Sequence, residues 1–256
     1  MKEKRLIRTV LVCLACSVLL QQALMVPGIS GLNRPETVEL PDVKPGVPGS
    51  FSDLMHRRRS IRTFGQGSMT LDQVAKIVFA AQGITRRNMY RTVPSAGALY
   101  PLEISIVTGP IQGLGPGVYK YRPQGHELEL IASGDRRKEL AQQSYRQMWV
   151  AEAQAVVVIC AVYGRVTAKY GQRGMRYAHI EAGCVAQNIS LEGINLGLGS
   201  TVVGAFIDSG VAEVIKADED EVPLIVMPVG LKTRPRGRAG SMQDQNLYAS
   251  SRNGWR

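Results

Sequence analysis

The sequence predicts an α+β fold, in which strands and helices mix without a regular strand–helix–strand repeat. Residues 155–162 are a continuous run of β-branched and small apolar residues, which is typical of a strand buried on both faces. Residues 118–122 and 127–132 predict two strands joined by a Pro-Gln-Gly-His turn. Residues 176–196 carry apolar positions at helical spacing and are followed by Gly197 and Gly199, so they predict one long helix.

Residues 1–30 differ in composition from the rest of the chain. They start with a basic stretch at 1–5 and turn apolar over 6–20, which is the order of a secretory signal peptide or an N-terminal membrane anchor. Because Cys16 follows a Leu-Ala pair, a lipoprotein site stays open beside a cleaved signal and an uncleaved anchor. An apolar first helix of the fold is disfavoured, because a Pro-rich stretch follows. We expect a bacterial-type protein that is exported or membrane-associated on the periplasmic side, without excluding the cytoplasm.

One domain at 51–236 is expected between a Pro-rich linker at 31–50 and a polar tail at 237–256. Prolines at 35, 41, 45 and 48 resist both a helix and a central strand, so the linker is expected to be extended. The tail is polar and contains glycine, which is typical of a loose chain end.

The domain opens with a short helix at 51–59 that presents a cluster of arginines. Thr70 and Gln73 have the spacing of a capping box, and the helix that they begin stops at Gly83. Its apolar face comprises Leu71, Val74, Ile77, Val78 and Ala81. The other expected elements are a strand at 103–108, a helix at 135–148, a strand at 201–206, a helix at 209–216 and a last strand at 222–229.

The formal net charge of +10 suits an anionic partner, but its distribution disfavours nucleic acid. The cations fall in short separate clusters, and with 6% aromatic residues no aromatic platform lies between them. The four cysteines do not form a disulfide framework. His56, His126 and His179 lack metal-ligand spacing, so we expect no metal site. No nucleophile elbow, P-loop or dinucleotide fingerprint is present.

Four stretches carry the candidate chemistry. They are an Arg-rich stretch at 57–64 (RRRSIRTF), a small-residue loop at 94–97 (PSAG), residues 169–177 (KYGQRGMRY) and residues 181–188 (EAGCVAQN). Guanidinium groups bind phosphate bidentately, and small residues let the backbone approach a flat ligand. In this order, the stretches resemble the nitroreductase superfamily of FMN enzymes, and within it the SagB-type dehydrogenases, which oxidise azoline rings in modified peptides. The resemblance covers residues 52–236.

The resemblance implies the nitroreductase-like fold, a central and mainly antiparallel sheet flanked by helices, with a long helix in a homodimer that holds FMN between its subunits. It places the FMN phosphate or polar edge near Arg58, Ser60 and Arg62, with Arg59 in the same cluster. It places Pro94, Ser95 and Gly97 beside the flavin ring and ribityl chain. Val203 and Gly204 would lie near flavin N5, although many relatives have Glu-Gly there. Either Arg234 or Arg236 would close on the phosphate.

Lys169 and Tyr170 are the candidate catalytic residues, because a Lys-Tyr pair is typical of the SagB-type enzymes. Oxidation of an azoline sends a hydride to FMN and a proton to a base, which an amine shielded from water can be. The predicted function is therefore FMN-dependent oxidation of a small-molecule or modified-peptide substrate. NAD(P)H-dependent reduction of a nitro or quinone compound is one alternative, with the nicotinamide stacked on the flavin. A non-catalytic flavin-binding partner in a complex is another.

Overall fold

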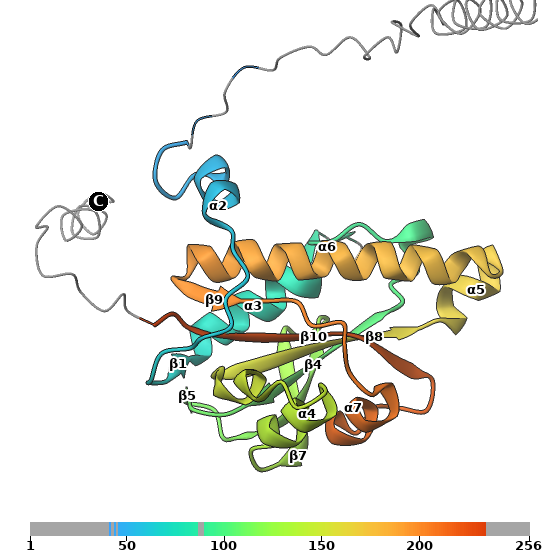
Figure 1. Ribbon diagram of the computed structural model, residues 1–256. Helices are drawn as coiled ribbons and strands as arrows, with labels where there is room; N and C mark the ends of the chain where they lie inside the picture. Colours follow the sequence, from blue (N-terminus) through green and yellow to red (C-terminus); the bar gives the residue numbers. More distant parts are fainter. Residues whose placement is uncertain (1–40, 42–43, 45, 87–89, 234–256) are drawn as a thin grey trace, which may run out of the picture. The chain divides into compact units, whose positions relative to one another are not determined.

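The computed structural model describes residues 41, 44, 46–86 and 90–233 (Figure 1). The expected signal or anchor, most of the linker, the tail, Arg234 and Arg236 lie outside these residues. The chain divides into two compact units, Met1–Lys44 and Pro45–Arg256, and every element below belongs to the second. Within the described ranges, no helix combines the length and apolar character needed to cross a membrane.

A six-stranded sheet forms the centre of this unit, with the order β7-β6-β4-β8-β10-β9. All its neighbouring strands are antiparallel, which confirms the α+β class with a mainly antiparallel sheet. The central strand β8 is buried at all eight positions, as its β-branched run predicts. The strands are β4 (Leu102–Thr108), β6 (Gly117–Arg122), β7 (Glu127–Ser133), β8 (Ala155–Val162), β9 (Leu198–Ser200) and β10 (Glu221–Leu231).

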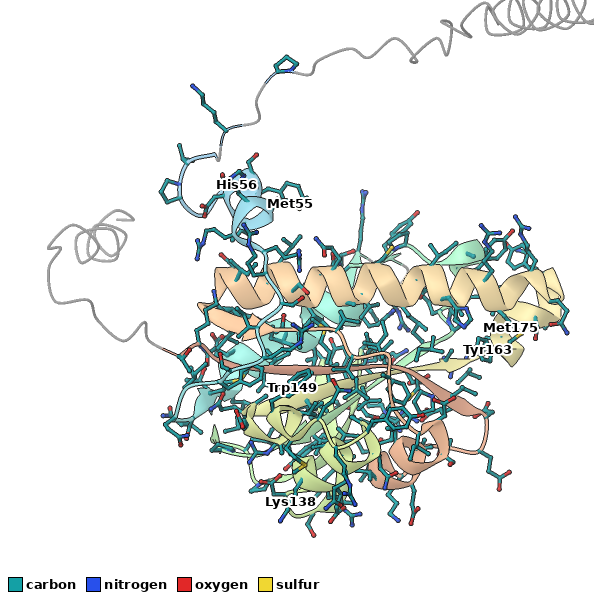
Figure 2. The ribbon with its side chains drawn as sticks, in the orientation of Figure 1. Met55, His56, Lys138, Trp149, Tyr163 and Met175 are labelled. Carbon is teal, nitrogen blue, oxygen red and sulfur yellow. The ribbon has the colours of Figure 1, made fainter. Side chains whose placement is uncertain are left out.

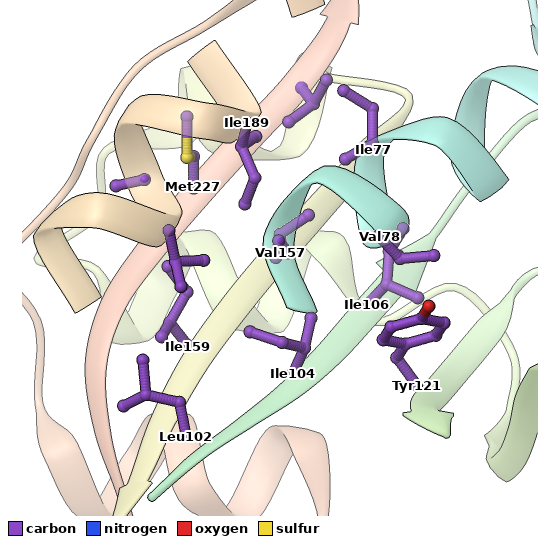
Figure 3. Packing of buried hydrophobic residues seen from close by; sticks show 14 of the residues in the cluster. Ile77, Val78, Leu102, Ile104, Ile106, Tyr121, Val157, Ile159, Ile189 and Met227 are labelled. Carbon is purple, nitrogen blue, oxygen red and sulfur yellow. The ribbon is translucent and has the colours of Figure 1, made fainter. Parts of the chain in front are cut away.

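Helices cover both faces of the sheet (Figure 1). α3 (Leu71–Gln82) and α6 (Arg173–Asn195) pack on one face, while α4 (Arg137–Gln143) and α7 (Asp208–Ile215) pack on the other. Figure 3 shows the first interface, where Ile104 of β4 and Val157 of β8 meet Ile77 of α3 and Ile189 of α6. Two separate hydrophobic clusters, one on each face, therefore hold the sheet in place.

The capping box at the start of α3 is confirmed. The backbone N–H of Gln73 donates to the Thr70 hydroxyl at 3.2 Å, and that of Thr70 donates to the Gln73 side chain at 3.0 Å. The predicted apolar face of α3 is buried except at Leu71, which is 43% exposed, so the assignment of Leu71 to this face is wrong. Gly83 ends the helix as expected, in an extended rather than a left-handed conformation.

Three sequence assignments need correction. The helix expected at 135–148 is only α4, because Tyr145 and Arg146 have positive φ, and a 3-10 turn follows at Met148–Glu152. The strand expected at 201–206 is wrong: β9 ends at Ser200, and Val203 makes only an isolated bridge to β10. A helix that was not predicted, α5 (Gly164–Tyr170), carries the Lys-Tyr pair.

Short elements complete the described fold. They are α2 (Phe51–Arg57), β1 (Met69–Thr70), β2 (Ile84–Arg86), β3 (Tyr90–Arg91), the 3-10 turn Ala96–Ala98 and β5 (Ile111–Gln112). Ser50 is the N-cap of α2, and its hydroxyl accepts a hydrogen bond from the backbone N–H of Asp53 at 3.3 Å. Its Met55 meets Gln187 of α6, so the arginine stretch starts beside the long helix.

Candidate functional site

The loop at 94–100 joins β3 to β4 and is built from unusual backbone conformations. Gly97, Ala98 and Tyr100 all have positive φ, at 62°, 54° and 46°. The backbone N–H of Tyr100 donates to the Ser95 hydroxyl at 2.9 Å, which closes the loop on itself. Left-handed non-glycine residues are uncommon and are held only where their surroundings determine them. The loop is therefore a fixed feature of the surface.

The structure brings the predicted catalytic pair to this loop. A Cβ added at Gly97 would lie 2.7 Å from Tyr170 Oη and 3.1 Å from Lys169 Nζ. Tyr170 is held edge-on by Tyr177 at 5.2 Å between ring centroids, and Lys169 Nζ lies 5.4 Å from the Tyr170 ring centre. Lys169 is exposed, however, so the single chain does not provide the shielding expected for this amine.

A buried polar network supports the loop from within. Glu181 of α6 is 3% exposed, accepts a hydrogen bond from the Gln82 amide at 3.4 Å, and hydrogen-bonds Ser95. Arg91 donates to the other end of the Gln82 amide at 2.8 Å. Burial raises the pKa of the Glu181 carboxyl, although Ser95, Gln82 and the charge of Arg91 act against that rise. The network fixes Ser95 against α6.

From the sequence, Glu181 belongs to the candidate stretch 181–188 but has no predicted chemical role of its own. The sequence does contain a signal for a specific role, because Glu181 stands among apolar residues on the inner face of a long helix. A carboxylate in such a place is rarely buried without a specific partner. A cavity of about 270 Å³ lies between the loop and α6 at this point, bordered by Pro94, Ser95, Tyr177, Ile180, Glu181 and Cys184.

The arginine stretch forms a second group of candidate residues. Ser60 forms a parallel bridge with Ser200, and the backbone N–H of Ile61 donates to the Ser200 carbonyl at 2.9 Å. The Arg62 guanidinium lies 5.8 Å from the ring centre of Trp149, which Figure 2 labels. Arg59 instead turns back on the end of α2 and donates to the carbonyls of His56 and Arg58, at 3.0 and 2.7 Å.

Thr201 and Lys232, which the sequence did not single out, lie near this second group, and the predicted residues Val203 and Gly204 follow Thr201 in the chain. The buried hydroxyl of Thr201, next to Ser200, has no hydrogen-bond partner among the described residues. Val203 is 4% exposed, whereas Gly204 is exposed, so only the glycine presents its backbone to solvent. Lys232 pairs with Phe64 at the end of β10, and burial, together with the charge of Arg57, lowers the pKa of its amine. Lys232 therefore adds a cation to the arginine stretch.

The two groups lie at opposite ends of α6. The loop 94–100 contacts α6 near Tyr177 and Glu181, whereas Ser60 pairs just beyond its last residue, Asn195. At 1.5 Å per residue, Glu181 and Asn195 are about 21 Å apart along the axis. In Figure 2, Met55 of α2 and Met175 of α6 lie toward opposite ends of the helix. The structure thus brings Lys169, Tyr170 and Gly97 together, but not with Ser60.

In the part of the chain that the structure covers, no three His, Cys, Asp or Glu side chains are grouped to hold a metal ion.

Comparisons with known proteins show the family of the chain. The model of the nitroreductase family matches residues 55–231. The chain is 43% identical over 195 residues to a proposed nitroreductase from Methanocaldococcus jannaschii, covering 76% of this chain and 96% of that protein. It is 32% identical to the microcin B17-processing protein McbC of Escherichia coli, over 55% of this chain and 54% of McbC. A solved structure of a proposed nitroreductase from Anabaena variabilis matches with a TM-score of 0.63 and 30% identity, over 71% of this chain and 38% of that one.

Proposed function

Because the chain belongs to the nitroreductase family, we propose that it is an FMN-dependent oxidoreductase of the SagB type, which oxidises an azoline-like ring. The observation that carries this proposal is the approach of Lys169 and Tyr170 to Gly97, at 3.1 and 2.7 Å from its Cβ position. A side chain at Gly97 would fill the space beside the pair, and its φ of 62° already favours glycine. The similarity to McbC, which processes microcin B17, supports a modified peptide as substrate.

The residues of the second group fit the phosphate end of FMN. Arg58, Arg62 and Lys232 offer cations, Ser60 offers an exposed hydroxyl, and Thr201 has a buried hydroxyl that still needs a partner. Charge-assisted hydrogen bonds from such groups to phosphate are among the strongest in proteins. Arg59 is not part of this set, because its guanidinium is already bonded to backbone carbonyls.

The loop 94–100 fits the flat end of the same cofactor, and its distance from Ser60 supports the participation of a second subunit. With the two groups about 21 Å apart along α6, we propose a homodimer in which the loop of one chain faces the arginine stretch of the other. Large apolar side chains support such an interface, because Phe51, Met55 and Ile180 are 68%, 49% and 57% exposed on α2 and α6.

In the proposed reaction, the substrate ring loses one hydride and one proton. When bound, FMN supplies the hydride acceptor. Lys169 Nζ takes the proton, and Tyr170, fixed edge-on against Tyr177, orients the amine. Lys169 is exposed in the single chain. In the proposed dimer, the second subunit and the bound ligands exclude water from its amine.

The test is replacement of Lys169 by Ala in the full chain, assayed with an azoline-containing peptide. We expect FMN to remain bound, measured by absorbance after gel filtration, while turnover falls by a factor of about 10² to 10⁴. Tyr170→Phe should show a smaller loss. Full turnover in Lys169→Ala would remove the amine from the mechanism.

A second candidate function is the NAD(P)H-dependent reduction of a nitro or quinone compound. It is favoured by the 43% identity to a proposed nitroreductase over nearly the whole of that protein. Reduction of the bound FMN by NADPH within seconds in a stopped-flow cell, without any heterocyclic substrate, would support this reaction.

A further inference from the structure

A separate cavity of about 370 Å³ borders the loop 94–100 at Tyr100. Three guanidinium groups line it, from Arg91 of β3, Arg122 of β6 and Arg165 of α5. The carboxylate in its lining is Glu103, at the start of β4. These residues come from four different elements, so the fold rather than one basic stretch assembles the cluster.

Each guanidinium is held in place by protein contacts. Arg91 lies 4.4 Å above the ring of Tyr100 and donates to Gln82. Arg165 forms an ion pair with Glu103 at 2.6 Å and donates to the carbonyl of Tyr100 at 2.9 Å. A guanidinium carries five N–H donors, and these contacts use only some of them. The remaining donors are oriented in advance, which lowers the cost of binding a ligand.

Arg122 is positioned in the same way from the other edge of the cavity, where its guanidinium pairs with Glu129 of β7 and its Nε donates to that carboxylate at 2.6 Å. One positive charge remains in excess, because the three guanidinium groups are matched by only two carboxylates, Glu103 in the lining and Glu129 beside it. Burial is the main cause that lowers the pKa of Arg91, and the like charge of Arg165 acts in the same direction, whereas Glu103, Tyr100 and Glu181 oppose it. An anion beside both guanidinium groups would favour their charged forms.

We propose that this cavity binds an anionic group of the substrate, a carboxylate or a phosphate, beside the reacting ring. The position follows from α5, because Arg165 and Lys169 lie one helical turn apart on the same face, with about 6 Å between their Cβ atoms. The placement relative to the reacting ring rests on the proposed function of Lys169 and Tyr170, whereas the binding of an anion does not. The rings of Tyr100 and Tyr121 give the cavity an aromatic wall, so an aromatic carboxylate is a suitable probe.

The experiment is isothermal titration of the full-length flavin-loaded protein with benzoate and with its neutral analogue benzamide. We expect benzoate to bind about tenfold more tightly or better, because a charge-assisted contact is stronger than a neutral one. Arg165→Gln and Arg122→Gln should each remove most of this preference. Arg136→Gln is the matched control, because Arg136 precedes α4 on the opposite face of the sheet, and it should keep the preference.

The wild-type comparison alone can overturn the proposal, even if a variant does not fold. Equal binding of benzoate and benzamide, or no binding of benzoate, would show that the cavity is not an anion site. An equal loss of the preference in all three variants would assign it to the general positive charge and also overturn the proposal. Competition by inorganic phosphate would indicate that phosphate is accepted, and its absence would indicate a carboxylate site. None of these measurements needs turnover, so failure of the proposed reaction would be seen separately.

Discussion

Replacing Gly97 by alanine tests how closely the loop 94–100 and the Lys-Tyr pair are fitted to each other. The new methyl group would lie 2.7 Å from Tyr170 Oη, whereas ordinary van der Waals contacts begin at about 3.4 Å. Tyr170 must therefore move away, and the pair loses its position. At a φ of 62°, alanine also costs about 1–2 kcal/mol relative to glycine.

These effects predict a stable but damaged enzyme. For a domain of this size, each kcal/mol lowers Tm by about 2–4 °C, so the backbone cost alone predicts a fall of roughly 2–8 °C. A displacement approaching 1 Å in a catalytic group can reduce turnover by about 10²-fold. The assays are thermal unfolding followed by circular dichroism, and turnover of the flavin-loaded protein.

A double-mutant cycle separates the contact from the backbone cost. Tyr170→Phe removes the oxygen that alanine would meet, so Gly97→Ala should destabilise less in that background, with a coupling of about 0.5 kcal/mol or more. Gly197→Ala is the control, because Gly197 has a φ of 75° and no neighbouring atom within 4 Å of the added Cβ. If the two changes at Gly97 and Tyr170 are additive, or Gly97→Ala is no worse than Gly197→Ala, the contact is not as the structure shows.

Three further predictions concern the arginines proposed to bind the FMN phosphate, the buried ion pair of Lys120 and the buried carboxyl of Glu181. Arg58→Ala and Arg62→Ala should each weaken FMN binding about tenfold or more, measured by quenching of flavin fluorescence; unchanged affinity would make the stretch an ordinary basic surface. Lys120 pairs with the buried Glu221, so Lys120→Met should cost about 3–5 kcal/mol in the free energy of unfolding, and adding Glu221→Leu should restore most of it. Because burial raises the pKa of Glu181, its contribution to stability is present at low pH and is lost as the pH rises through that pKa. In the wild type, Tm should therefore fall between acidic and neutral pH, and Glu181→Gln should abolish the part of this fall that comes from Glu181. If the pH profile of Tm is the same in the variant, the raised pKa of Glu181 is wrong.

Local patterns in the sequence were enough to predict most of the elements. The capping box of Thr70 and Gln73 needs only four consecutive residues, and the run at 155–162 is buried whatever covers it. The α+β class follows from such patterns. They also predicted a strand at 201–206, which the structure does not form. A β-branched segment forms a strand only where a neighbour pairs with it, and pairing with β10 stops at Ser200 apart from one bridge.

The resemblance predicted residues of the candidate site, but only the tertiary structure decided how they are grouped. Gly97 and Tyr170 are far apart in sequence, and their contact depends on α5, which the sequence did not predict. Glu181 reaches Ser95 and Gln82 only because α6 packs over the end of α3. Residue periodicity reports which face of an element is buried, not which other element covers it. Long-range packing therefore determined both the supporting network and the separation of the loop from the arginine stretch.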